Sequence, residues 1–159
     1  MDLNIRSAVA ADVPLILSLV RELAAYEKLA HEVVATEADF SRSLFGAPPR
    51  AHALVLEAEG TVAGFALYFY NFSTFLGRPG LYIEDVFVRR GFRRHGFGRA
   101  VFKHLARTAI AENCGRMEWW VLDWNEPAIR FYKSLGAVPM EEWTVQRLTG
   151  DALQACADS

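Results

Sequence analysis

A glycine-rich turn between a strand-like segment and a helix-like segment constrains the fold of this chain more than any other feature. Residues 81–88 have the composition of a β-strand, and residues 101–110 carry apolar side chains at the three- and four-residue spacing of an amphipathic helix. The turn between them holds Arg93, Gly96 and Gly98. Glycines let a ligand approach the backbone, and the following helix directs its positive N-terminal end at the turn, which favours a pyrophosphate. A solvated basic turn, with glycines only for tightness, is the alternative.

Three phosphate-binding patterns compete for this turn. A Walker A loop needs G-x-x-x-x-G-K-[ST]; Gly91 and Gly96 have the spacing, but Phe97 stands where the lysine is required. A dinucleotide fingerprint needs a third glycine or alanine where this chain has Val101. The pattern [RQ]-x-x-G-x-[GA] does fit, although chance produces it in roughly one sequence of this length in ten. The turn therefore needs support from the rest of the chain.

The remaining segments predict a mixed α/β sheet within a single domain that spans residues 1–159. A chain of this length usually builds one core. The predicted elements, in order, are a strand at 3–5, a helix from Asp12, a helix from Thr36 to Gly46, strands at 52–58 and 61–70 joined at Glu59-Gly60, the strand at 81–88, the helix after the turn, a strand at 117–124 buried on both faces, a short helix from Asn125 to Gly136, and a closing pair of strands within 138–148.

Composition excludes several classes of protein. The formal net charge is −2, and a general nucleic-acid binder needs a basic surface, so no nucleic-acid partner is expected. No apolar stretch approaches the roughly 20 residues that span a membrane, and residues 1–7 lack the pattern of a signal peptide. Cys114 and Cys156 have no metal-ligand spacing and are expected to be free thiols. We expect a cytoplasmic protein without a bound metal or a membrane partner.

A second motif follows the predicted buried strand. Residues 124–133 have the sequence WNEPAIRFYK, in which an Asn-led helix contains an aromatic residue and a tyrosine. Together with the strand and the turn before it, this motif resembles the GNAT superfamily of N-acetyltransferases. The segments ELAAYE at 22–27 and YIEDVFV at 82–88 are further similar to the diamine acetyltransferases that act on spermidine, spermine or thialysine. The resemblance covers nearly the whole chain and implies a splayed, mostly antiparallel central sheet flanked by helices.

The resemblance implies that acetyl-coenzyme A is the co-substrate and lies in the gap of the splayed sheet. Its pantetheine arm is expected to pair with the backbone of Val86, Phe87 and Val88. Asn125 and Ala128 are expected near the end of that arm. The residues of the turn that are expected to bind the co-substrate are Arg93, Arg94, His95, Gly96, Phe97, Gly98 and Arg99. The N–H groups from Arg94 through Arg99 are expected to bind its pyrophosphate.

The chemistry of amine acetylation requires a base, since a primary amine with a pKa near 10.4 is almost fully protonated at neutral pH. Glu84 is the candidate base, directly or through a water, because strict strand alternation places it on the face of Val86 and Val88. Glu84 is also a candidate substrate-binding residue, since a carboxylate there attracts a cation. The alternative is an exposed glutamate in an ion pair. Tyr132 is the candidate acid for the departing thiolate and a donor-binding residue, because the matched family position supplies a phenol near the sulfur. A tyrosine packed in the core is its alternative.

The acceptor site is less specified by the sequence. Tyr26 and Glu27 match positions that face the amine in the diamine enzymes, and Trp119 and Trp120 occupy positions where relatives place substrate-pocket side chains. These tryptophans differ from the family pattern, so the identity of the amine stays open. Four further carboxylates lie near these positions in the sequence: Asp85, Glu118, Asp123 and Glu126. They either add negative potential that attracts a polycation or are solvated surface groups.

The predicted function is therefore transfer of an acetyl group to a primary amine of a small molecule, either a diamine or polyamine or a thialysine-like amino acid. Another acceptor, such as an amino acid, an antibiotic or a protein amine, is the first alternative. A non-catalytic coenzyme A-binding module is the second, and the presence of both Glu84 and Tyr132 speaks against it. The resemblance also implies a homodimer, with the aromatic segment around Trp143 as a candidate contact.

Overall fold

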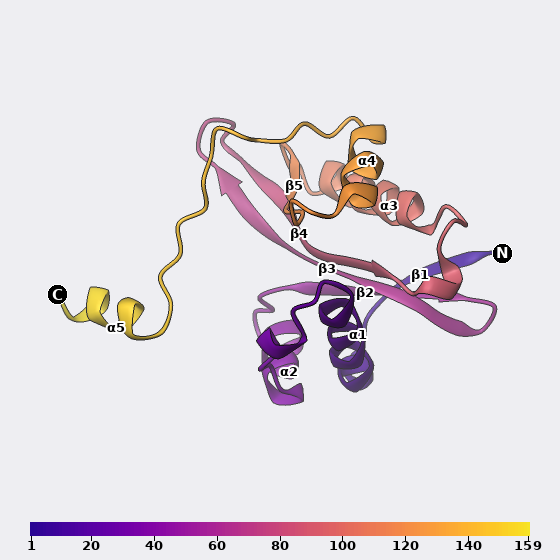
Figure 1. The fold of residues 1–159 in the computed structure, drawn as a ribbon, viewed down its shortest axis with the longest axis horizontal. Helices are drawn as coiled ribbons and strands as arrows, with labels where there is room; N and C mark the ends of the chain where they lie inside the picture. The colour runs from indigo at the N-terminus through magenta and orange to yellow at the C-terminus, as the bar shows by residue number, and fades with distance from the viewer. The chain divides into compact units, whose positions relative to one another are not determined.

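A five-stranded sheet is the frame of the first part of the chain (Figure 1). The computed structural model describes residues 1–159, which form two compact units, 1–120 and 121–159. The sheet has the order β1-β2-β3-β4-β5, in which the first four strands are antiparallel and β5 runs parallel to β4. The strands are β1 (Leu3–Ser7), β2 (His52–Ala58), β3 (Thr61–Ser73), β4 (Arg78–Val88) and β5 (Met117–Trp119). The predicted mixed, mostly antiparallel sheet is confirmed.

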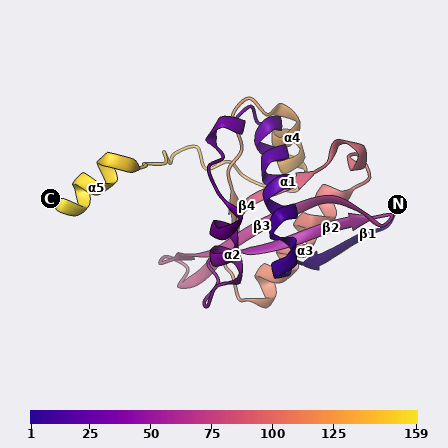
Figure 2. The same cartoon turned by 90° about the horizontal axis from the view of Figure 1, so that it is seen from below.

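Helices cover both faces of this sheet. Figure 2 shows α1 (Val13–Tyr26) and α2 (Glu37–Phe45) crossing one face, and Figure 1 shows α3 (Phe97–Ala111) on the other. The apolar stripe of α1 meets the inner face of β3, where Ile16, Leu19, Phe65 and Leu67 share one buried cluster. The helix α2 begins at the predicted capping box, because the Thr36 hydroxyl accepts the N–H of Asp39.

The stripe predicted for α3 is buried with one exception. Val101, Phe102, Leu105 and Ala109 are all at most 5% exposed, whereas Ile110 is 78% exposed. Ile110 is the second-last residue of α3. The burial of the rest fixes the orientation of the helix, and with it the position of the glycine-rich turn that precedes it.

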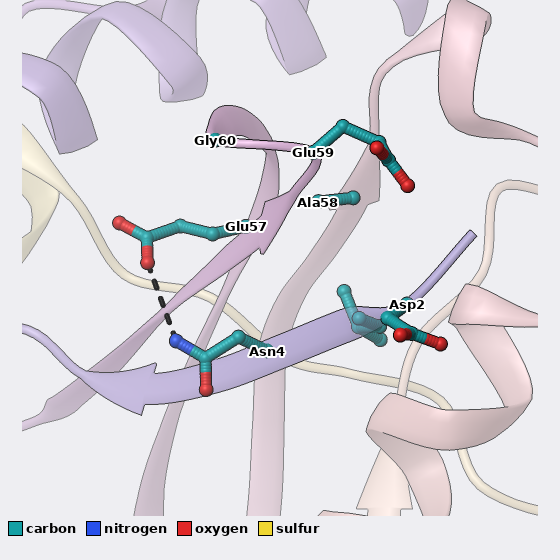
Figure 3. A pocket seen from close by; sticks show the side chains of 7 residues that line it. Asp2, Asn4, Glu57, Ala58, Glu59 and Gly60 are labelled. Atoms are coloured by element: carbon teal, nitrogen blue, oxygen red, sulfur yellow. Dashed lines mark hydrogen bonds between the residues drawn. The ribbon is translucent and has the colours of Figure 1, made fainter.

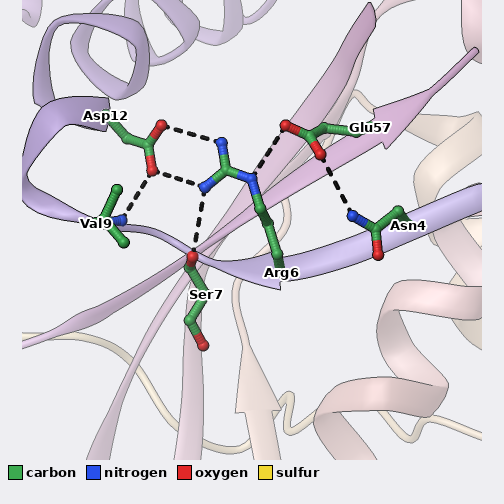
Figure 4. Close-up of polar contacts among 6 residues, drawn as sticks. All are labelled: Asn4, Arg6, Ser7, Val9, Asp12 and Glu57. Carbon is green, nitrogen blue, oxygen red and sulfur yellow. Dashed lines mark hydrogen bonds and ion pairs between the residues drawn. The ribbon is translucent and has the colours of Figure 1, made fainter. Parts of the chain in front are cut away.

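A hydrogen-bonded network around Arg6 joins the first strand to the start of α1 and to β2 (Figure 4). The Arg6 guanidinium donates to both carboxylate oxygens of Asp12, at 2.8 and 3.0 Å, and through Nε to Glu57 at 3.0 Å. The Asp12 carboxylate also accepts the N–H of Val9 at 2.8 Å. The bonds from Arg6, followed by the N–H of Val9, hold the pKa of Asp12 below its ordinary value despite partial burial. The network fixes the beginning of the helix whose far end carries Tyr26.

The second unit contains α4 (Glu126–Ser134) and α5 (Gly150–Asp158). Asn125 caps α4 as predicted, since its side-chain oxygen accepts the N–H of Ala128 at 3.4 Å. Asn125 is only 9% exposed, which is unusual for an amide side chain unless its hydrogen bonds are satisfied. None of the helices in the structure is both long and apolar enough to cross a membrane.

Two strand predictions near the end of the chain are wrong. The segment predicted as a strand over 117–124 forms only the three residues of β5, and Trp120 beyond it is 59% exposed rather than buried on both faces. Residues 138–148 form no strand, and Trp143 within them is 77% exposed. Aromatic and β-branched side chains favour a strand only where a neighbouring strand and a packed face exist. β5 is the edge of the sheet, so its length is limited by the part of β4 that it pairs with.

Candidate functional site

One edge of β4 has no strand partner over its last five residues. β5 pairs only with residues 81–83 of β4, so the residues from 85 to 88 pair with β3 alone. The two strands thus diverge beyond Ile83. Because an unpaired strand edge presents free N–H and C=O groups, an extended ligand with amide groups can pair with it as an added strand.

Val86 and Val88 direct their backbone groups toward this open edge. The N–H of Arg89 donates to the carbonyl of Ala63 in β3 at 2.8 Å. Alternate residues of an antiparallel strand face opposite neighbours, so the backbone of Phe87 also faces β3 and the valines face away from it. Of the three residues predicted to pair with an extended ligand, two therefore present their backbone to it.

A β-bulge lies at the start of the open edge. Asp85 pairs with Leu67 and Ile83 pairs with Tyr68, which leaves Glu84 without a partner in β3. The strict alternation used to place Glu84 on the face of the valines is therefore wrong, because the bulge interrupts it. Glu84 is exposed and lies close enough to the Asp85 carboxyl to raise its pKa by charge repulsion.

Four carboxylates gather at this bulge. Burial, followed by repulsion from Glu84 and Glu27, raises the pKa of Asp85 to about 7. Burial also raises the pKa of Glu27, which lies just beyond the C-terminal end of α1. Burial and the charges of Glu84, Glu118 and Asp85 raise the pKa of Tyr82 to about 12. Glu118 is ion-paired with Arg116 at 3.1 Å, so Glu27, Glu84 and Asp85 give the site the negative potential that favours a cation, and Asp85 titrates near neutral pH.

Aromatic side chains line the same region. Tyr82 lies between Phe69, at 4.9 Å between ring centroids, and Trp120, whose ring meets it edge-on at 6.1 Å. Trp119 instead contacts Phe102 of α3 at 4.9 Å. The structure therefore separates the two predicted acceptor residues, and only Trp120 lies beside Tyr82 and its surrounding carboxylates.

The glycine-rich turn forms a helix N-terminus without a side-chain cap. Gly96 is the N-cap of α3 with φ of 80°, and Arg94 also has a positive φ of 65°. Such backbone angles favour glycine at the N-cap and produce the tight turn. Gly96 has no side chain that could cap the first N–H groups of the helix, such as those of Phe97 and Gly98. These groups and the helix dipole favour an anion at this position.

The arginines around the turn have different surroundings. Arg89 is held by Glu22 of α1 at 2.9 Å and by the carbonyl of Val62 at 3.0 Å, so it joins elements of the fold. Arg93 donates to the carbonyl of Val88 at 2.9 Å. Arg94 is exposed and has no hydrogen bond or ion pair, so its charge is available to a ligand. His95, also exposed, lies with its ring 6.0 Å from that of Phe97.

Three of the predicted site residues belong to the second unit. Asn125 and Ala128 form the first turn of α4 through the capping bond. Tyr132, one turn further along the same helix, has its ring 5.7 Å from that of Phe131. The capping bond gives Asn125 and Ala128 a structural role at the start of α4. The catalytic role of Tyr132 stays a prediction.

A shallow hollow of about 240 Å³ lies elsewhere, at the β1–β2 edge (Figure 3). Its lining includes Asp2, Glu57 and Glu59, but Glu57 is already bonded to Arg6 and, at 3.3 Å, to Asn4. None of the predicted site residues lines it. The hollow is therefore no competitor to the region around β4.

Comparison with known proteins identifies the family. The acetyltransferase (GNAT) family matches residues 18–137, a range that includes the open edge and the glycine-rich turn. The chain belongs to the acetyltransferase (GNAT) family. This membership makes it an acetyl-coenzyme A-dependent N-acetyltransferase, as the sequence predicted, and the predicted likeness to diamine acetyltransferases is confirmed by its relatives.

Two curated relatives match this acetyltransferase over most of their length. A thialysine N-epsilon-acetyltransferase of Bos taurus is 38% identical, over 96% of this chain and 96% of its own. An L-ornithine N5-acetyltransferase of Arabidopsis thaliana is 36% identical, over 96% of this chain and 86% of its own. Among solved structures, an integron cassette protein from the mobile metagenome of V. cholerae has a TM-score of 0.82 at 29% identity, covering 100% of this chain and 99% of that one.

Sequence reasoning missed two features of this acetyltransferase. Tyr82 lies at the centre of the aromatic and acidic group, but the sequence offers only its place in the segment YIEDVFV. Asp85 was expected at most to add negative potential, whereas its burial makes it the carboxyl of the site that titrates near pH 7. The signal for both is the bulge at Glu84, which becomes visible only with the partner strand in place.

Proposed function

We propose that this acetyltransferase transfers the acetyl group of acetyl-coenzyme A to a primary amine of a small molecule that carries a second cationic group. Diamines, polyamines and thialysine-like amino acids have this chemistry. The observation that carries the proposal is the gathering of Glu27, Glu84 and Asp85 around the bulge of β4. The relatives named for thialysine and L-ornithine, both of which have a side-chain amine, support it.

The donor residues fit acetyl-coenzyme A. The open edge at Val86 and Val88 suits an extended arm with amide groups, and the uncapped N-terminus of α3 suits a pyrophosphate. Arg94 supplies an unpaired positive charge beside that N-terminus. When bound, the co-substrate supplies an activated acetyl thioester. The role of the protein is then to hold that group near the carboxylates and to exclude competing water.

The amine must lose a proton before it attacks. For a pKa near 10.4, the cost of reaching the neutral form at pH 7 is about 4.6 kcal/mol. Glu84 is the proposed base, directly or through a water, because it is exposed and adjacent to the bulge. Burial and the negative charge of Glu84 raise the pKa of the neighbouring Asp85 to about 7, so a carboxyl beside Glu84 can hold a proton near neutral pH.

Tyr132 is the proposed acid. A phenol donates a proton to the departing thiolate, which is a tolerable leaving group, so the gain from this step is moderate. Its support is the position of Tyr132 within the WNEPAIRFYK motif, on α4 beyond the Asn125 cap.

The second cation of the acceptor is proposed to lie against the Tyr82 and Trp120 rings. Aromatic faces attract ammonium groups, and the attraction is stronger beside carboxylates such as Glu84. Tyr26 and Glu27, at the end of α1, are the proposed opposite wall. Trp119 remains a less direct candidate, since it contacts Phe102 of α3.

An acceptor panel tests the proposal. Thiol release from acetyl-coenzyme A would be followed with spermidine, thialysine, ornithine and 1,4-diaminobutane, with butylamine as the monoamine matched in length to the last. We expect kcat/KM for the diamine to exceed that for butylamine by about tenfold or more, the scale of one good cation site. Equal values for the two would contradict the second cation site. No thiol release with any amine would contradict the function itself.

A further inference from the structure

The Arg93 side chain connects the open edge of β4 to the end of α1. Its Nε donates to the carbonyl of Val88 at 2.9 Å. Its guanidinium lies over the ring of Tyr26, 4.7 Å from the centroid, and 5.9 Å from the centroid of the Phe87 ring. One planar cation therefore contacts the strand that is proposed to bind the donor and the helix that is proposed to face the acceptor.

These contacts affect both halves of the proposed site. The Val88 carbonyl faces the open edge, so the bond from Arg93 occupies the last acceptor on that edge and leaves the N–H of Val88 and both groups of Val86 for a ligand. Tyr26 is 42% exposed and is the last residue of α1. A guanidinium over its ring restricts the motion of this side chain.

The first arginine of the turn thus differs from the second. Arg94 is exposed at a positive φ and has no hydrogen bond or ion pair, which suits a phosphate ligand. The guanidinium of Arg93 already contacts a backbone carbonyl and two aromatic rings. A planar guanidinium suits such contacts, and they direct it away from a phosphate ligand.

We propose that the Arg93 side chain is a positioning group for the acceptor, which holds Tyr26 against the end of the donor edge, and that it is not a phosphate ligand. The inference rests on the proposed function, because Tyr26 is taken to face the amine. It makes the geometry of the acceptor wall depend on a residue of the donor turn.

Steady-state kinetics of three alanine variants test this assignment. Arg93→Ala should raise the acceptor KM by roughly fivefold and the acetyl-coenzyme A KM by less than about twofold, the scale of one exposed cation–π contact. Arg94→Ala should instead raise the acetyl-coenzyme A KM and change the acceptor KM little. Arg107→Ala, on the exposed face of α3 and without a hydrogen bond or ion pair, is the matched control and should change neither. A rise confined to the acetyl-coenzyme A KM of Arg93→Ala would overturn the proposal.

Replacement by lysine separates shape from charge. Arg93→Lys keeps the positive charge but loses the planar face and the Nε donor. If Arg93 positions Tyr26, the lysine variant should retain most of the increase in acceptor KM seen with alanine. Full recovery with lysine would mean that charge alone is needed, as for phosphate attraction, and would refute the positioning role.

A double-mutant cycle with Tyr26 tests the route of the effect. In a Tyr26→Leu background, Arg93→Ala should raise the acceptor KM little further, while in a Tyr26→Phe background, which keeps the ring, it should act as in the native chain. Effects that multiply in the leucine background would show that Arg93 does not act through Tyr26.

The free energies of urea unfolding of the same Arg93 and Tyr26 variants test the contact without any measurement of activity. If the native protein releases no thiol with any amine, the proposed function fails, and the Arg93–Tyr26 contact is then judged by unfolding alone. Non-additive unfolding free energies for Arg93→Ala and Tyr26→Leu would support the contact. Additive values would overturn it.

Discussion

Asp85 lies directly opposite Leu67 in the β3–β4 ladder, so a carboxyl group shares the face of the sheet that packs against α1. Leu67 is 8% exposed and belongs to the core cluster of that face. The adjacent bulge at Glu84 brings a second negative charge to Asp85. A charged group is thus held where burial and repulsion both oppose its ionisation, which is an arrangement typical of functional sites rather than of stability.

This relationship predicts that Asp85→Asn stabilises the protein at alkaline pH. The folded pKa of Asp85, about 7, lies above the ordinary 3.8, so the folded state binds more protons and its stability falls as pH rises between these values. The full difference is on the order of 4 kcal/mol above pH 8. Urea unfolding of both proteins from pH 4 to pH 8 measures it, and the gain of the variant should grow with pH. If the two proteins differ by the same free energy of unfolding at every pH in this range, the pKa of Asp85 is not raised in the folded state.

The same titration should appear in the activity. If the Glu84 and Asp85 pair accepts the proton of the amine, kcat/KM rises with pH through an inflection near 7, where Asp85 ionises. Glu84→Gln removes the charge that opposes this ionisation, so the inflection should move to lower pH even though turnover also falls. Profiles of kcat/KM against pH for the two proteins provide the measurement. If the inflection stays at the same pH in the variant, the ionisation of Asp85 does not control the reaction.

Phenol donation predicts the behaviour of Tyr132→Phe. Loss of the hydroxyl should lower kcat by about 100-fold, the scale of one proton-transfer group, while both KM values change little. The ring and its contact with Phe131 are kept, so α4 should remain folded. Circular dichroism checks the fold and single-turnover kinetics isolate the chemical step. An unchanged kcat would remove Tyr132 from the mechanism.

The aromatic wall predicts a change of selectivity for Trp120→Leu. Removing the indole beside Tyr82 should lower kcat/KM for 1,4-diaminobutane by about fivefold and leave butylamine nearly unaffected, because only the diamine presents a second cation. Trp119→Leu is the neighbouring comparison; it should mainly lower the free energy of unfolding, since Trp119 contacts Phe102. Equal losses for both amines in Trp120→Leu would argue against a cation site at this ring.

Local sequence signals predicted the parts of the fold that depend on neighbours in the chain. Thr36 and Asp39 cap α2 as expected, and the β2–β3 hairpin turns at Glu59 and Gly60, which both have a positive φ. The N-cap at Gly96 and the cap at Asn125 belong to the same class. Each of these features is decided within four residues, so one sequence is enough to find it.

The features that sequence reasoning missed depend on distant pairing. The bulge at Glu84 exists only relative to β3, and it changes which face every earlier side chain of β4 occupies. The contact of Arg93 with Tyr26 joins residues that no local pattern links. The closing pair of strands expected within 138–148 had a suitable composition, yet these residues form no strand, because composition alone does not decide strand formation. A local sequence pattern does not show which distant residues a segment pairs with or contacts.

The Arg6 network predicts a stability effect unrelated to the active region. Arg6→Ala leaves the half-buried Asp12 and Glu57 carboxylates without their cation, and loss of such charge-assisted bonds costs about 1 to 3 kcal/mol. Arg42→Ala is the matched control, because its ion pair with Asp39 is exposed to solvent and such pairs contribute little to stability. The pKa of Asp12 is lowered, so its contribution is present above the ordinary value and is lost as pH falls through the folded pKa. Urea unfolding of the three proteins at pH 7 and pH 3 should therefore show a gap between Arg6→Ala and the native chain that narrows at low pH. A gap no larger than that of Arg42→Ala would mean that the network does not hold the start of α1.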